Sequence, residues 1–224
     1  TSTNNAPGDL DFGAGSTALG VEWHSAADFL ADGLKMSASW STDNGAAKGA
    51  TARLENSWGV GATYVTSAGD TTLTIGGGYG SGDIVTSGTA ATSDKAGANV
   101  GVSAVTGDLT VGVGYGDGDT FVANDATAST NRQVDGSVLK AGIKYVTGDI
   151  TLALGMSAGE GKDGNFGTAG TTDDSTDSTS ASVTYAVASG VSAVLGYTTV
   201  DENDEGSSAT TGGSAWYVGA TMSF

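Results

Sequence analysis

S-A-W-Y-V-G-A-T-M-S-F, residues 214–224, is the stretch that decides the fold of this chain. Successive side chains of a β-strand point to opposite faces, so every second residue shares a face. The apolar face of this stretch consists of Trp216, Val218, Ala220, Met222 and Phe224. Its other face is small or hydroxylated. Such a strand fits a soluble sandwich, with the apolar face on the core. It also fits a transmembrane barrel, with that face on lipid and the other on a water-filled lumen.

The same alternation recurs along the whole chain, whereas helical periodicity is almost absent. Ten further segments repeat it, which makes eleven candidate strands. They are residues 17–24, 34–40, 58–64, 73–79, 100–104, 109–115, 139–145, 150–156, 183–187, 191–197 and 214–224. The sequence therefore predicts an all-β, antiparallel, up-and-down fold.

The connections between these segments alternate in length. Tight turns containing Gly and Asp or Ser lie at residues 65–70, 105–109, 146–150 and 187–191, with a degenerate copy at 31–33. Long acidic segments rich in Gly, Ser and Thr are predicted as loops near residues 43–48, 82–95, 116–133, 158–177 and 201–213. Short turns on one rim and long loops on the other are typical of a bacterial outer-membrane β-barrel.

Aromatic residues gather at both ends of the predicted strands. Beside the long loops lie Trp40, Trp58, Tyr79, Tyr115, Tyr197 and Trp216. Beside the short turns lie Tyr64, Tyr145, Tyr185 and Phe224. Two aromatic belts around an aliphatic band mark the two interfaces of a membrane. The pattern favours the transmembrane barrel over a sandwich whose strand-end aromatics cap a core.

Composition excludes several classes of function. The chain has 8 basic and 25 acidic residues and a net charge of −17, which disfavours binding to nucleic acid phosphates. Without cysteine it can form no disulfide and no thiolate metal site. No run of about 20 apolar residues is present to form a transmembrane helix. His24 is the only histidine, which disfavours the Ser/His site that an outer-membrane barrel hydrolase needs. No enzyme is predicted.

The terminal strand ending in Phe224, the Y-V-T-G-D-I-T-L hairpin at residues 145–152 and the acidic loops resemble the general diffusion porins of Gram-negative bacteria, of the alphaproteobacterial type. The resemblance implies a passive channel for ions and small hydrophilic solutes in the bacterial outer membrane. It also implies contact with outer-membrane lipid and lipopolysaccharide, a homotrimer, and no cofactor. Porins of this type have sixteen strands, and their third long loop folds inward.

Counting back from the C-terminal strand as strand sixteen makes residues 17–24 strand six. About eleven strands of a probable sixteen would then be present, with the N-terminal strands missing. Residues 1–16 would be the tail of the inward loop, and residues 17–224 would form the barrel strands.

Alternation also predicts the residues that line the pore. The set opposite to the lipid-facing one contains Glu22, Lys35, Lys140 and Lys144. A charged side chain facing lipid near the midplane would cost about 2–4 kcal/mol, so interior placement is favoured physically. Asp9 and Asp11, on the inward loop, would supply negative charge at the constriction.

A second interpretation remains open. The glycine- and aspartate-rich segments at residues 77–83 and 116–119 resemble the calcium-binding β-roll of secreted toxins and adhesins. Loop-bound Ca²⁺ is a further hypothesis, because carboxylates cluster in the predicted loops. The candidate ligands are Asp173, Asp174, Asp177, Asp201 and Glu202.

Overall fold

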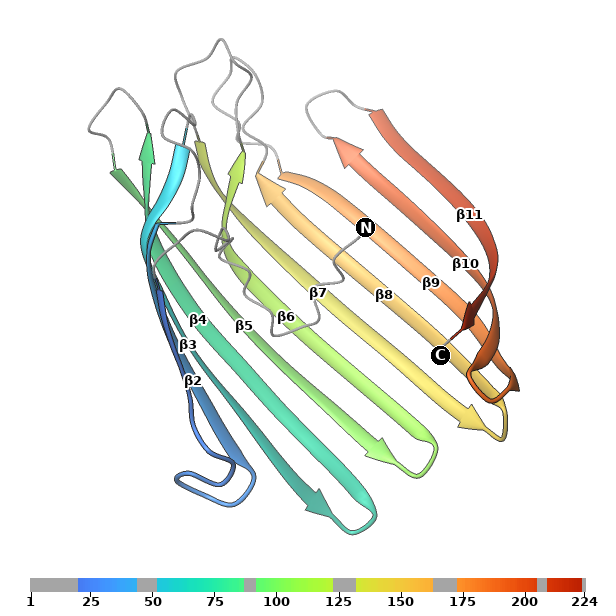
Figure 1. Ribbon diagram of the computed structural model, residues 1–224. Helices are drawn as coiled ribbons and strands as arrows, with labels where there is room; N and C mark the ends of the chain where they lie inside the picture. Colours follow the sequence, from blue (N-terminus) through green and yellow to red (C-terminus); the bar gives the residue numbers. More distant parts are fainter. Residues whose placement is uncertain are drawn as a thin grey trace.

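The computed structural model describes residues 20–43, 52–86, 92–122, 132–162, 173–204 and 209–222. This part of the chain forms eleven strands (Figure 1). They are β1 (Gly20–His24), β2 (Leu34–Asp43), β3 (Ala52–Ala68), β4 (Thr71–Thr86), β5 (Thr92–Thr106), β6 (Leu109–Val122), β7 (Arg132–Thr147), β8 (Ile150–Lys162), β9 (Asp173–Ala188), β10 (Val191–Asp204) and β11 (Ala209–Met222). Within the described ranges, no helix is long and apolar enough to cross a membrane.

Each strand pairs with its neighbours in sequence, and every pairing is antiparallel. The strand order is therefore β1 to β11 without a crossover. Figure 1 shows one tilted, curved sheet with the short turns at one rim. β1 and β11 do not pair with each other, so the described sheet is open along these two edges. This confirms the all-β, antiparallel, up-and-down topology.

The short turns are built by glycines in the left-handed backbone region. Gly69, Gly107 and Gly148 have φ values of 61°, 54° and 57°, and each is followed by an aspartate. Each Gly-Asp pair connects two directly paired strand ends. Glycine at the first central position with positive φ is the pattern of a type II′ turn, whose twist matches that of the two strands it joins.

Adjacent hairpins are also tied together at this rim. The carbonyl of Asp108 accepts a hydrogen bond from the Val146 amide at 2.9 Å, and the carbonyl of Asp149 accepts one from the Ala186 amide at 2.8 Å. Because each turn carbonyl bonds to the next hairpin, the relative register of consecutive hairpins is fixed at the short-turn end.

At the other rim the strands run further than the sequence predicts. β4 continues from Tyr79 to Thr86 and β6 from Tyr115 to Val122, so these aromatic residues do not mark strand ends. The predicted loops at residues 43–48, 82–95, 116–133, 158–177 and 201–213 therefore lie partly in paired strands. The prediction failed there because the extensions are mostly Gly, Ser, Thr and Asp, and their apolar residues are adjacent, as at Ile84-Val85 and Phe121-Val122. No alternation of hydropathy therefore remains to indicate a strand.

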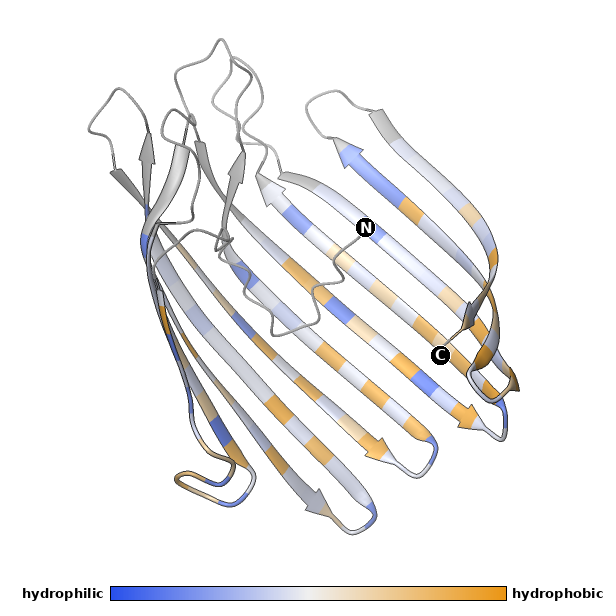
Figure 2. Cartoon of the chain, viewed as in Figure 1, coloured by the Kyte–Doolittle hydropathy of each residue, from blue (hydrophilic) through white to orange (hydrophobic). Residues whose placement is uncertain are grey.

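The sheet is a single layer with two different faces. Along the strands, hydrophobic residues alternate with hydrophilic or small ones (Figure 2). In the described part of the chain, no large side chain is fully buried and no polar or charged residue is buried. The large hydrophobic side chains of the convex face are instead exposed, among them Val60, Ile75, Val113, Leu154 and Leu195. The described sheet thus has no enclosed core.

Candidate functional site

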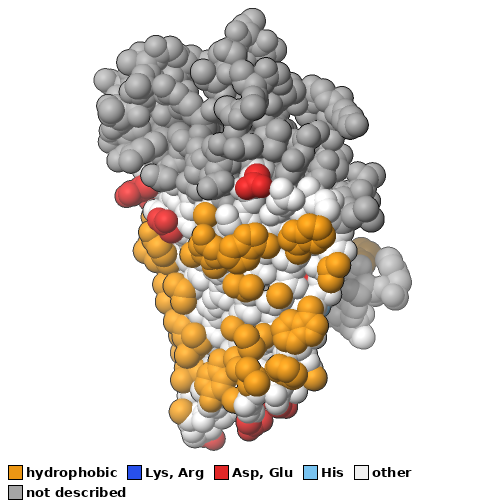
Figure 3. All heavy atoms as spheres, turned by 90° about the vertical axis from the view of Figure 1, so that its left-hand side faces the viewer, with side chains coloured by type: hydrophobic (Ala, Val, Ile, Leu, Met, Phe, Trp, Pro, Cys, Tyr) orange, Lys and Arg blue, Asp and Glu red, His pale blue; other side chains and the backbone are white. Residues whose placement is uncertain are grey.

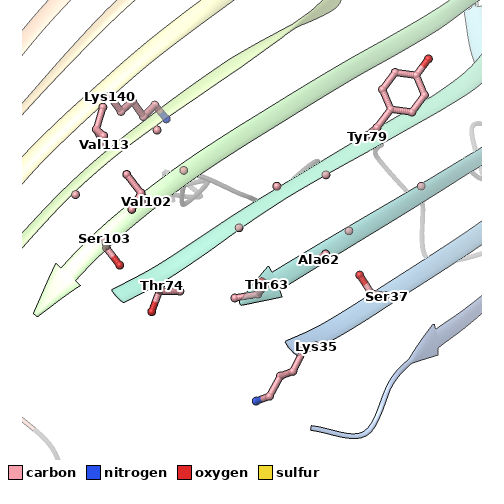
Figure 4. A pocket seen from close by; sticks show the side chains of 18 of the residues that line it. Lys35, Ser37, Ala62, Thr63, Thr74, Tyr79, Val102, Ser103, Val113 and Lys140 are labelled. Carbon is pink, nitrogen blue, oxygen red and sulfur yellow. The ribbon is translucent and has the colours of Figure 1, made fainter. Parts of the chain in front are cut away.

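The concave face of the sheet surrounds a hollow of about 1230 Å³. Strands β1 to β9 contribute residues to its lining. The side chains on this face are mostly absent or short and hydroxylated, as at Ser37, Thr63, Thr74 and Ser103 in Figure 4. A surface of this composition offers hydrogen bonds to water.

Glycine is concentrated in the middle of this lining. Gly76 lies directly opposite Gly101, which in turn lies opposite Gly114. Gly142 of β7 lies opposite Gly155 of β8. Because these positions carry no side chain, the backbone itself forms the wall there.

The structure places three of the predicted charged residues along the hollow. Glu22, Lys35 and Lys140 line it, from β1, β2 and β7 respectively, and Figure 4 labels both lysines. Lys144 lies four residues beyond Lys140 on β7, and the alternation puts it on the same face, nearer the short turn. Asp9 and Asp11 lie outside the described residues.

His24 joins this set. It lines the hollow, and its Nε2 lies 2.8 Å from Oε1 of Glu22. Both side chains are exposed, and they share one face of β1 because they are two residues apart. This close pair places an imidazole beside the Glu22 carboxylate on the wall of the hollow.

Hydrophobic side chains cover the part of the convex face seen in Figure 3, and the predicted aromatic residues lie towards the two ends of the strands. At the long-loop end, Trp58 and Tyr79 are in tilted contact with ring centroids 5.4 Å apart, and Tyr197 and Trp216 with centroids 4.5 Å apart. The other predicted members of this band are Trp40, directly opposite Trp58, and Tyr115, whose hydroxyl donates to Asp117 at 3.1 Å.

The second band lies at the short-turn end. Tyr64, Tyr145 and Tyr185 are 40–48% exposed there, while Phe224 lies outside the described residues. Trp23 and Phe29 add an edge-to-face pair with ring centroids 5.8 Å apart. The sequence analysis did not assign these two residues to an aromatic belt. Hydrophobic rings exposed in two bands match the interfaces of a membrane.

One aromatic residue lies on the concave face instead. The ring of Tyr217 covers Gly196, so a Cβ at that glycine would coincide with the phenol. The two residues are directly opposite each other on β10 and β11. The alternation in residues 214–224 already assigns Tyr217 to this face, but a cross-strand contact with a glycine becomes visible only once the register is known.

The three calcium candidates whose side chains are described do not form one cluster. Asp177 and Asp201 are directly opposite each other on β9 and β10, but Glu202 follows Asp201 and therefore points to the other face. The backbone of Asp173 and Asp174 lies in β9, and their side chains are outside the description. Among the described residues, no three His, Asp or Glu side chains come close enough together to hold a metal ion.

The segments that resembled a β-roll are ordinary strand residues. Residues 77–83 lie in β4 and residues 116–119 lie in β6, each paired antiparallel with its neighbours. A β-roll requires tandem turns stacked in parallel, so the pairing does not support the secreted calcium-binding alternative.

Comparison with known proteins gives a family and a fold. The sequence model for the Gram-negative porin family matches residues 9–223. No curated protein sequence matches the chain. OmpF of Salmonella typhi, solved in complex with daunomycin, superposes with a TM-score of 0.65 at 18% identity, over 90% of this chain and 61% of OmpF.

Two other solved structures are similar. The outer membrane channel DcaP of Acinetobacter baumannii gives a TM-score of 0.61 at 14% identity, over 96% of this chain and 68% of DcaP. A loop-deletion mutant of OmpT, an outer membrane protein of Vibrio cholerae, gives 0.58 at 19% identity, over 91% of this chain. The chain spans only 62% of that OmpT mutant.

Proposed function

This chain belongs to the Gram-negative porin family, and we propose that it forms the wall of a passive, water-filled channel for ions and small hydrophilic solutes. The family and the strand-only fold place it in the bacterial outer membrane. They point to a channel rather than to an enzyme.

One observation carries the proposal, namely the division of a single-layer sheet into two unlike faces. The convex face exposes aliphatic side chains between two aromatic bands, which is the surface a bilayer stabilises. The concave face exposes glycine, hydroxyl and charged groups around a hollow of about 1230 Å³. With lipid on one side and water on the other, both faces are satisfied without a protein core.

The partners of the channel follow from the same surfaces. We propose that the convex face contacts outer-membrane lipid and lipopolysaccharide, and that small hydrophilic solutes and ions pass along the concave face. The homotrimer is a proposal that rests on the family resemblance. Loop-bound Ca²⁺ is not part of the proposed mechanism, because the described carboxylates form no ligand group.

We further propose that the complete barrel contains strands beyond the eleven described here, sixteen in all. The support is physical: β1 and β11 each leave a row of backbone N–H and C=O groups unpaired by the described sheet. Inside a membrane such groups must be hydrogen-bonded, so an open edge is not stable there.

Planar lipid bilayers test the channel directly. The full-length protein should insert in discrete steps, and each step should have a conductance that is linear with voltage. That result is expected because the concave face surrounds a hollow of about 1230 Å³ lined largely by glycine and short hydroxylated side chains. Absence of current steps from protein shown to be folded in the membrane would contradict the proposal.

A further inference from the structure

We propose that the concave faces of β7, β8 and β9 form a binding site for polyhydroxylated carboxylates of the sugar-acid type. The proposal rests on the channel function, because it assigns a solute class to part of the channel wall. The site is defined by Lys140, Gly142 and Lys144 of β7, Gly155 of β8, and the serines of β9.

Two ammonium groups flank a gap along β7. Lys140 and Lys144 lie on the same face with Gly142 midway between them. Their Cα atoms are about 14 Å apart, at roughly 3.4 Å per residue of an extended strand. Since a lysine side chain is long and flexible, either ammonium can reach a carboxylate placed over Gly142.

The floor of this gap is bare backbone. Gly142 lies directly opposite Gly155, and Gly155 lies opposite Ser180. A Cβ at Gly142 would have as its close neighbour only the Leu154 carbonyl, at 3.3 Å, so no side chain covers this glycine. A Cβ at Gly155 would lie 3.2 Å from the Ser180 hydroxyl oxygen. The Ser180 hydroxyl is therefore close to the bare backbone at Gly155.

Hydroxyl groups continue along the same side of the gap. Ser157 lies between Lys140 and Ser178 in one cross-strand row. On β9, every concave-face position from residue 176 to 184 carries a hydroxyl, at intervals of about 7 Å along the strand. The members are Thr176, Ser178, Ser180, Ser182 and Thr184.

The chemistry of the site selects its ligand. An ammonium attracts a carboxylate, and a row of hydroxyls can donate to and accept from the hydroxyls of a polyol chain. Among the acids of these strands whose side chains are described, Glu160 and Asp177 lie on the opposite face by alternation, so these two do not repel an anion here. No aliphatic side chain lies on the concave face between the two lysines, so an apolar chain gains nothing.

Three probes separate the contributions of charge and hydroxyl groups. Gluconate carries both, hexanoate has the same charge without the hydroxyls, and sorbitol has the hydroxyls without the charge. In bilayers of the full-length protein, gluconate should interrupt the current at concentrations at which hexanoate and sorbitol do not. Equal interruption by hexanoate, or by sorbitol, would overturn the proposal.

The variants locate the site. Lys144→Gln and Lys140→Gln should each weaken the gluconate effect about three- to fivefold, the size expected for a partly hydrated ion pair. Lys35→Gln is the matched control, since it removes the same charge from the concave face of β2, opposite Thr63 and away from the serine row. An equal loss in Lys35→Gln would mean that only the overall charge of the lumen matters, and would contradict the site.

A third variant tests the gap itself. Gly155→Val should fill the floor and abolish the gluconate effect while the conductance in potassium chloride persists. Calorimetric titration of gluconate into the detergent-solubilised protein gives a readout that needs no current. Binding that is lost in Lys144→Gln would support the site even if no channel were recorded. Absence of binding in that titration, with normal channels in bilayers, would overturn the site and leave the channel intact.

Discussion

Glycine residues have two separate roles in this sheet. Gly107 and Gly148 have φ values of 54° and 57° and no heavy atom within 4 Å of a hypothetical Cβ, so only their backbone conformation requires glycine. Gly142 and Gly155 have ordinary strand conformations, and there glycine leaves room above the backbone. The first role serves folding and the second shapes the lumen.

Replacing Gly148 by alanine should destabilise the fold by about 1–2 kcal/mol, because an L-residue is strained at positive φ. Equilibrium unfolding by urea of the protein refolded into lipid vesicles measures this. Gly213→Ala is the matched control, since Gly213 has equally open space but no positive φ. Equal destabilisation of the two variants would show that the strain at Gly148 is not the cause.

At the scale of the strand, a two-residue alternation assigns every side chain to lipid or to water. β5 illustrates this with adjacent residues: Val102 lies between Ile75 and Val113 on the convex face, and Ser103 lies between Thr74 and Gly112 on the concave face. Val102 is 41% exposed in the isolated sheet, which is area available to lipid. The same strand therefore meets two solvents with opposite preferences.

Val102→Lys should destabilise the protein folded in a bilayer by about 2–4 kcal/mol. This is the cost of placing a lysine on the lipid face near the midplane. Ser103→Lys should cost much less, because that side chain projects into the aqueous hollow. Refolding yield and urea unfolding in lipid vesicles compare the pair. If Ser103→Lys proved the more damaging variant, the assignment of the two faces would be reversed.

At the scale of the whole molecule, the described residues form a curved sheet of eleven strands that is open between β1 and β11. It superposes on OmpF with a TM-score of 0.65 over 61% of OmpF. The convex side chains of β11 are the most exposed of the apolar band, with Val218 at 84% and Trp216 at 72%, because no strand covers its outer edge. Further strands along this edge and along β1 would complete the enclosure of the lumen.

The mass of the protein isolated from outer membranes should exceed the 21.8 kDa of this chain by the mass of about five strands and their connections. The physical reason is the hydrogen-bonding demand of two open sheet edges within lipid. Intact-mass spectrometry measures it. A mass close to 21.8 kDa would contradict the sixteen-strand register while leaving the porin fold in place.

The sequence alone determined the number and order of the strands, the positions of the short turns and the face on which Lys35, Lys140 and Trp216 lie. These features are local, since they depend on a period of two residues and on turn glycines a few residues apart. Asp9, Asp11 and Phe224 lie outside the described residues, so their roles stay predictions.

The tertiary structure decided how far the strands continue beyond the aromatic bands and which residues meet across them. The Tyr217 ring lies over Gly196, and the Ser180 hydroxyl lies next to Gly155. Each of these contacts joins residues on two different strands. Asp177 and Asp201, predicted as loop residues, are instead paired within strands. Such contacts depend on register, which is set by turn geometry and by hydrogen bonds between hairpins, and a shift of one residue would turn each side chain to the opposite face.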